Sequence, residues 1–118
     1  MITLVIGASS NVERYSYKAV NLLKQYGFPV IALGNKEGKI KDVEINTGRP
    51  NFDNIHTVTL YVGVDKQAEY FDYILGLKPQ RIIFNPGTEN QEFIQLAKSH
   101  NIETVVDCTL VMLNTGIF

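Results

Sequence analysis

The sequence of 118 residues lacks several features that mark specialised classes of protein. It has one cysteine, Cys108, so no internal disulfide can form, which is usual in a reducing compartment. No apolar run approaches the roughly 20 residues that span a bilayer, and the short apolar run near the start has no basic region before it, unlike a signal peptide. We therefore expect a cytoplasmic protein with no membrane partner.

Neither sign of charge is in excess. The 11 Lys and Arg residues and the 12 Asp and Glu residues give a net charge of −1, which offers no bulk attraction to nucleic acid. The hydrophobic content of 45% and the charged content of 19% are ordinary for a globular protein. At this length we expect one domain over residues 1–118.

Segments of strand and helix character alternate along the chain. Apolar, β-branched and aromatic runs predict five main strands, at residues 2–6, 28–33, 57–62, 81–84 and 102–106. Apolar residues at helical spacing predict helices at 15–26, 66–77 and 89–100, the last capped by Thr88. This alternation is typical of right-handed crossovers and a mostly parallel sheet. The sequence therefore predicts an α/β, Rossmann-like domain with strand order 3-2-1-4-5 and helices on both faces.

Two remaining segments have weaker patterns. Residues 43–45 could add a short edge strand, and residues 107–118 form a tail whose pattern favours no element.

In such sheets a ligand binds beyond the carboxyl ends of the strands, where the strand order reverses. The candidate site residues therefore follow the predicted strands. They are Gly7, Ala8, Ser9, Ser10 and Asn11, then Gly34, Asn35 and Lys36, then Val62 and Gly63, and finally Asn85, Pro86, Gly87, Glu89 and Asn90. A fifth group, after the last strand, comprises residues 107–109.

The turn 7–11 joins a buried strand to a helix. Such a turn leaves N–H groups unpaired at the positive end of the helix dipole, where an anion such as phosphate fits. Gly7 allows a sharp turn and the close approach of a ligand. The turn is neither G-x-G-x-x-G nor a Walker A loop, which argues against a typical dinucleotide site and against ATP hydrolysis. A turn that simply starts a helix well is the alternative.

Lys36 stands where NAD-binding proteins usually carry an acidic residue for the ribose. Together with Lys39 it favours a ligand with a phosphate on its ribose, such as NADP or coenzyme A; a solvated turn lysine is the alternative. Arg14 could pair with a phosphate or be an ordinary surface arginine. The turn 85–90 could also bind phosphate, or could simply begin a helix.

No catalytic or metal-binding set is predicted. Cys108 would need a neighbouring base or cation to be reactive, and neither His56 nor His100 can be placed near it, which favours an inert thiol.

Several motifs, in order along the chain, resemble one family. They are V-I-G-A-S-S-N followed by R-Y-S, a helix ending in Y-G, the strand P-V-I-A-L-G, the turn N-P-G-T-E-N and the ending V-V-D-C-T-L. This arrangement resembles the small stand-alone CoA-binding domain proteins, which are similar to the CoA-binding domain of the succinyl-CoA synthetase α-subunit. The similarity covers nearly the whole chain.

The resemblance implies a Rossmann-like fold whose first turn binds the CoA phosphates. By position it implies contacts to the pyrophosphate from Gly7, Ala8, Ser9 and Asn11, with Arg14 and Ser16 beside them. It places Lys36 near the ribose phosphate, and Gly87, Glu89 and Asn90 in the matching later turn. The phosphohistidine and ligase domains of the synthetase are absent, so its reaction is not implied.

We therefore expect a module that binds a small molecule, coenzyme A or an acyl-CoA, without evident catalysis. The alternatives are an NADP-binding or CoA-dependent enzyme subunit, the latter using Cys108, and a protein-interaction domain with an empty pocket. A homo-oligomer stays open, because aromatic residues could form an apolar face for a second copy.

Overall fold

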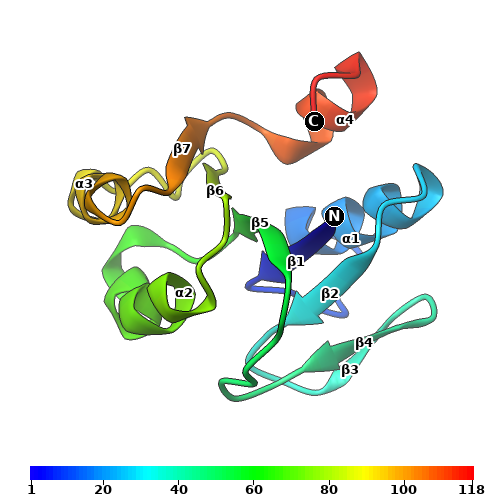
Figure 1. Cartoon of the computed structure of the whole chain (residues 1–118). Coiled ribbons are helices and arrows are strands. Elements are labelled where there is room, and N and C mark those ends of the chain that lie inside the picture. Colours follow the sequence, from blue (N-terminus) through cyan, green and yellow to red (C-terminus); the bar gives the residue numbers. More distant parts are fainter.

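A computed structural model describes all residues from 1 to 118, and its framework is one seven-stranded sheet of order β3-β4-β2-β1-β5-β6-β7 (Figure 1). The strands are β1 (Ile2–Ile6), β2 (Val30–Leu33), β3 (Gly38–Ile40), β4 (Val43–Asn46), β5 (Ile55–Leu60), β6 (Arg81–Phe84) and β7 (Glu103–Val106). Every neighbouring pair is parallel except β3 with β4.

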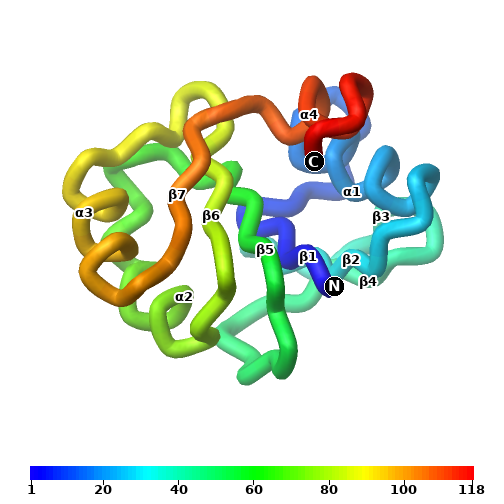
Figure 2. Tube along the Cα trace, turned by 45° about the horizontal axis from the view of Figure 1, so that its top comes forward, coloured from blue at the N-terminus to red at the C-terminus, as the bar shows by residue number.

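Helices cover both faces of the sheet (Figures 1 and 2). One face carries α1 (Tyr15–Gln25) and α4 (Thr109–Thr115), and the other carries the 3-10 helix η1 (Val64–Tyr70), α2 (Phe71–Leu77) and α3 (Gln91–Ser99). Alternate residues of the central strand point to opposite sides: Leu4 and Ile6 pack with α2 and α3, and Val5 packs with α1. Burial on both faces explains why β1 is apolar almost throughout.

The predicted class is confirmed: the fold is α/β and Rossmann-like, with a mostly parallel sheet covered on both faces. The predicted count of five strands and the order 3-2-1-4-5 are wrong. The short strand β4 pairs with β2 through Ala32↔Ile45 and Leu33↔Asn46, and so occupies the place expected for residues 57–62. Strand β5 instead pairs with β1 on its other side.

The local sequence explains this difference. Strand β4 has only four residues, and β3 lies in a glycine- and charge-rich stretch typical of a turn. The Asn46 side chain donates a hydrogen bond to the Ala32 carbonyl oxygen at 3.1 Å, which helps to fix β4 against β2. The short strand predicted at 43–45 is thus present as β4, but it lies between β2 and β3 rather than at the edge of the sheet.

Two helical predictions also change, and a helix forms in the tail, where none was predicted. The segment predicted at 66–77 begins as a 3-10 helix and continues as α2. Helix α3 is capped by Asn90, whose Oδ1 accepts from the Phe93 N–H at 3.3 Å, rather than by Thr88. The tail after β7 contains α4. None of the helices combines the length and apolar character needed to cross a bilayer.

Candidate functional site

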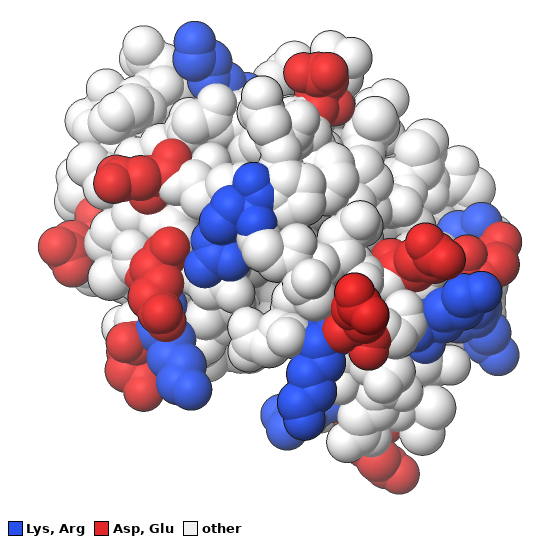
Figure 3. All heavy atoms as spheres, turned by 90° about the horizontal axis from the view of Figure 1, so that it is seen from below, with Lys and Arg blue, Asp and Glu red and all other residues white.

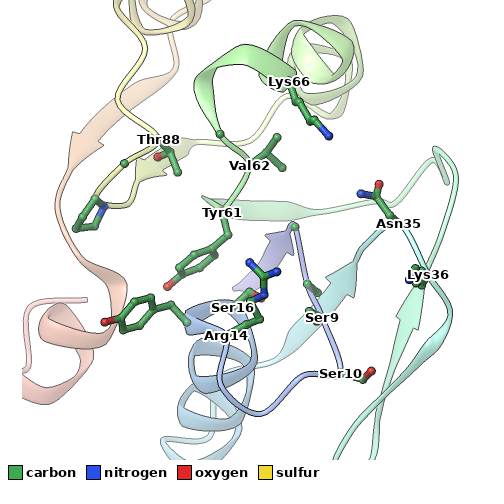
Figure 4. Close-up of a pocket in the computed structure, with 16 residues that line it drawn as sticks. Ser9, Ser10, Arg14, Ser16, Asn35, Lys36, Tyr61, Val62, Lys66 and Thr88 are labelled. Atoms are coloured by element: carbon green, nitrogen blue, oxygen red, sulfur yellow. The ribbon is translucent and has the colours of Figure 1, made fainter.

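A cavity of about 600 Å³ opens at the carboxyl ends of the central strands (Figure 4). Most of the predicted site residues line it: Gly7, Ala8, Ser9, Ser10, Arg14, Ser16, Asn35, Lys36, Val62, Gly63, Pro86 and Gly87. Four lining residues were not predicted as site residues: Tyr15, Tyr61, Lys66 and Thr88. Five predicted residues do not line it: Asn11, Gly34, Asn85, Glu89 and Asn90.

Gly7 begins the turn after β1 and has a left-handed φ of +94°. The N–H groups of Gly7 and Ala8 both donate to the Leu33 carbonyl oxygen at 2.9 Å, which ties the turn to the end of β2. A Cβ atom on Gly7 would lie 2.8 Å from the Tyr61 carbonyl oxygen. Glycine is therefore required here by the neighbouring backbone, whether or not a ligand also approaches.

Gly34, at the end of β2, also lies too close to a neighbouring backbone to carry a side chain. A Cβ atom on it would overlap the Ala8 carbonyl oxygen, so the chain after β2 lies directly against the first turn. The Gly34 N–H donates to the Asn46 carbonyl oxygen at 2.9 Å. Gly34 thus lies behind the cavity and holds its neighbours Asn35 and Lys36 at the edge.

The start of α1 leaves donors free. Arg14 occupies the N-cap position in an extended conformation, and no side chain caps the helix. The N–H groups of Tyr15, Ser16 and Tyr17 find no acceptor within the chain. The Asn11 side chain accepts from the Glu13 N–H at 3.0 Å, so it closes the turn before the helix instead of lining the cavity. The free donors lie at the positive end of the helix dipole.

The cavity is locally cationic. Arg14, Lys36 and Lys66 line it, no Asp or Glu does, and none of the three forms an ion pair. The one ion pair of the chain, Lys24 with Asp42, lies elsewhere. The face in Figure 3 shows acidic and basic side chains interspersed, without a broad patch of one sign. A nearly neutral protein thus concentrates unpaired positive charge at one cavity, as an anion-binding site requires.

The turn after β6 uses its polar groups internally. Asn85 is buried, and its Nδ2 donates to the Thr59 hydroxyl at 2.7 Å and to the Leu60 carbonyl oxygen at 2.9 Å. Its Oδ1 accepts from the Thr109 N–H at 2.9 Å. Glu89 accepts from the Gly87 N–H at 2.7 Å. These side chains hold the turn in shape and leave few donors for a ligand.

A second buried amide, Gln67, joins two walls of the cavity. Its Nε2 donates to the Val62 carbonyl oxygen at 2.9 Å and to the Thr88 carbonyl oxygen at 2.7 Å. Its Oε1 accepts from Asn90 Nδ2 at 3.2 Å. Sequence reasoning missed Gln67, although its spacing from Tyr70 and Ile74 places it on the apolar face of the predicted helix. A glutamine on such a face needs buried partners.

Tyr61 is the first residue beyond β5, because that strand ends at Leu60 and not at the predicted Val62. Its hydroxyl is buried and makes no hydrogen bond. Burial raises the pKa of this hydroxyl well above its usual range, and the nearby Cys108 thiol raises it further; the Thr109 and Thr59 hydroxyls lower it, but by less. Tyr61 is therefore a neutral hydrogen-bond donor at any physiological pH.

Cys108 is half-buried beside Tyr61 and does not line the cavity. No group of three or more His, Cys, Asp or Glu side chains is placed to hold a metal ion. His56 lies at the start of β5, with its Nδ1 2.8 Å from the Thr57 hydroxyl.

A family model described as a CoA binding domain matches residues 2–114. The chain belongs to this CoA-binding domain family. The family resemblance seen in the sequence is thereby confirmed. No curated protein sequence matches the chain.

Solved structures share the fold of this CoA-binding domain. One, described as an uncharacterized protein, is 44% identical, with 99% of this chain and 97% of that chain covered and a TM-score of 0.97. A protein from Thermus thermophilus is 17% identical, with coverage of 99% and 90% and a TM-score of 0.87. A hypothetical protein from Pyrococcus horikoshii is 19% identical, with coverage of 98% and 82% and a TM-score of 0.85. The last two similarities concern the fold alone.

Proposed function

We propose that the protein binds coenzyme A or an acyl-CoA in the cavity at the carboxyl ends of β1, β2, β5 and β6. The observation that carries the proposal is the combination of free N–H groups at the start of α1 with three unpaired cations and no carboxylate. This donor set suits a ligand with phosphates at more than one point. Membership of the CoA-binding domain family supports the same ligand class.

The positions of the cations suggest how such a ligand would lie. Lys36 stands at one edge of the cavity, after β2, and would meet the ribose phosphate (Figure 4). The N–H groups of Ser16 and Tyr17, with Arg14, would hold the pyrophosphate. Lys66 extends from η1 on the wall opposite Arg14 and adds a third positive charge (Figure 4). The tail of CoA, which ends in a thiol or thioester, would extend past Tyr61.

NADP is the second candidate, because it also carries a pyrophosphate and a ribose phosphate, and Lys36 could serve either ligand. The two ligands differ beyond the pyrophosphate, where NADP has a second nucleoside and CoA has a flexible amide-containing tail.

Calorimetric titration of the purified protein with CoA, dephospho-CoA, NADP and NAD tests the proposal. We expect CoA to bind with micromolar affinity, dephospho-CoA more weakly and NADP not at all. Tighter binding of NADP than of CoA would favour the second candidate. Absence of heat with all four ligands, repeated at a tenfold higher protein concentration, would overturn the proposal and favour an interaction domain.

A further inference from the structure

Tyr61 combines two properties that are rarely found together. Its side chain lines the cavity, and its hydroxyl is buried without a hydrogen-bond partner. A buried donor without an acceptor is costly, because it has given up its hydrogen bonds to water. The unpaired hydroxyl therefore calls for an acceptor that the free protein does not supply.

The neighbouring hydroxyls are already engaged. Thr59 Oγ1 accepts from Asn85 Nδ2 at 2.7 Å and lies 2.7 Å from Thr109 Oγ1, with which it shares a hydrogen bond. Asn85 in turn is saturated by Leu60 and by the Thr109 N–H. The Thr59 and Thr109 hydroxyls lie close enough to Tyr61 to lower its pKa, but neither forms a hydrogen bond with its hydroxyl.

The direction of Tyr61 identifies the part of a ligand that it could meet. In Figure 4 its hydroxyl points away from Asn35 and Lys36, and away from Lys66. Lys36 and Lys66, two of the three cations of the cavity, therefore lie away from this hydroxyl. A buried position beside the Cys108 thiol is unfavourable for an anion, as the raised pKa of the Tyr61 hydroxyl reflects. The acceptor that fits is uncharged.

We propose, as an extension that rests on the proposed function, that the Tyr61 hydroxyl donates a hydrogen bond to a carbonyl oxygen on the tail of the bound ligand. An amide or thioester carbonyl is a neutral acceptor of the right kind, and the tail of an acyl-CoA carries both groups. Tyr61 then selects ligands that extend beyond the nucleotide with such a carbonyl. Side chains at this end must shift to admit the tail, and Tyr15, which lines the same cavity and is 67% exposed, is free to move.

The test compares Tyr61→Phe with the matched control Tyr73→Phe. The Tyr73 hydroxyl donates to the Pro50 carbonyl oxygen at 2.6 Å and lies outside the cavity. Melting temperature is measured without ligand, and affinity is measured with two probes, CoA and adenosine 3′,5′-bisphosphate, which has the ribose phosphates but no tail.

The two variants should change in opposite directions. Tyr61→Phe removes an unpaired buried hydroxyl, so we expect its melting temperature to rise by a few degrees. We expect its affinity for CoA to fall about 2- to 12-fold, the value of one neutral hydrogen bond, with no change for the bisphosphate. Tyr73→Phe should melt at a lower temperature and bind both probes as the wild type does.

Three results would overturn the inference. They are unchanged CoA affinity in Tyr61→Phe, equal weakening of both probes, and a lower melting temperature for this variant, which would show that the hydroxyl is already bonded in the free protein. These results differ from a failure of the proposed function, in which the wild type would bind neither probe.

Discussion

The turn after β1 and the turn after β6 both join a parallel strand to a helix, and each has one glycine and several polar residues, yet they use their polar groups differently. In the first turn, no side chain caps α1, and the N–H groups of Ser16 and Tyr17 remain free. In the second, Asn90 caps α3 and Glu89 accepts from Gly87. Similar composition thus produces one turn that can receive a ligand and one that serves as a rigid wall.

The difference lies in which side chains return to their own backbone. Asn and Asp side chains readily bond to nearby N–H groups, as Asn90 does with the Phe93 N–H, whereas Asn85 bonds to the distant Thr109 N–H. At the first turn Asn11 engages the Glu13 N–H, one residue before Arg14, and so leaves the helix donors uncovered. Substitutions in the first turn should therefore affect affinity, and those in the second turn should affect stability.

Gly7→Ala should give the largest loss of stability. It is an exception to the division between the two turns, because Gly7 lies in the first turn, where most substitutions should affect affinity. The new Cβ would meet the Tyr61 carbonyl oxygen at a positive φ, so we expect the free energy of unfolding to fall by about 3 kcal/mol or more. Urea denaturation measures this change. Gly48→Ala, with φ of +76° and open space around it, is the control and should lose only about 1–2 kcal/mol from backbone strain. Equal losses would show that the contact with Tyr61 is harmless.

Asn85→Ala should be the next largest effect. It removes three hydrogen bonds in a buried place and leaves the Thr109 N–H without its acceptor, so we expect a loss of about 2–3 kcal/mol in unfolding free energy. The folded variant should keep its CoA affinity. Asn35→Ala, at the exposed edge of the cavity, is the control and should leave stability within about 0.5 kcal/mol. A large loss of CoA affinity in folded Asn85→Ala would place Asn85 among the ligand contacts, as the sequence suggested.

Lys36→Ala should leave stability unchanged and weaken CoA roughly tenfold or more, the value of a charged hydrogen bond, while dephospho-CoA changes little. Parallel calorimetric titrations of both ligands measure the difference. Lys39→Ala is the matched control, because Lys39 is exposed on β3 and does not line the cavity. Equal weakening of the two ligands by Lys36→Ala would remove Lys36 from its role at the ribose phosphate.

Glu89→Ala should give the smallest effect of the four substitutions. It tests whether the second turn fails to bind ligand because its own side chains occupy its N–H groups. It frees the Gly87 N–H at the cavity wall and removes a negative charge nearby, so we expect CoA to bind about twofold more tightly. Glu92→Ala, in the first turn of α3, is the control and should leave affinity unchanged. Weaker binding in Glu89→Ala would instead make Glu89 a ligand contact.

The sequence predicted the strands and helices whose apolar pattern is long and regular, such as β1, β5 and α1. It did not predict the strand order, because four residues of β4 carry too little pattern to reveal their pairing with β2. The cavity gathers most of the predicted residues because the carboxyl ends of parallel strands lie at one edge of the sheet. Asn85 was wrongly predicted to line the cavity, because the sequence does not reveal that its side chain bonds to Thr59, Leu60 and Thr109 instead. Tyr61 was missed because β5 ends earlier than predicted.

The close contacts at Gly7 and Gly34 have a further consequence for genetics. In each case the nearest obstacle to a side chain is a main-chain carbonyl oxygen, at Tyr61 and at Ala8. Every amino acid carries that oxygen, so no replacement at position 61 or 8 could make room for a larger residue opposite. A search for second-site suppressors of a Gly34→Ala defect should therefore recover changes that stabilise the protein globally, and none at the point of contact.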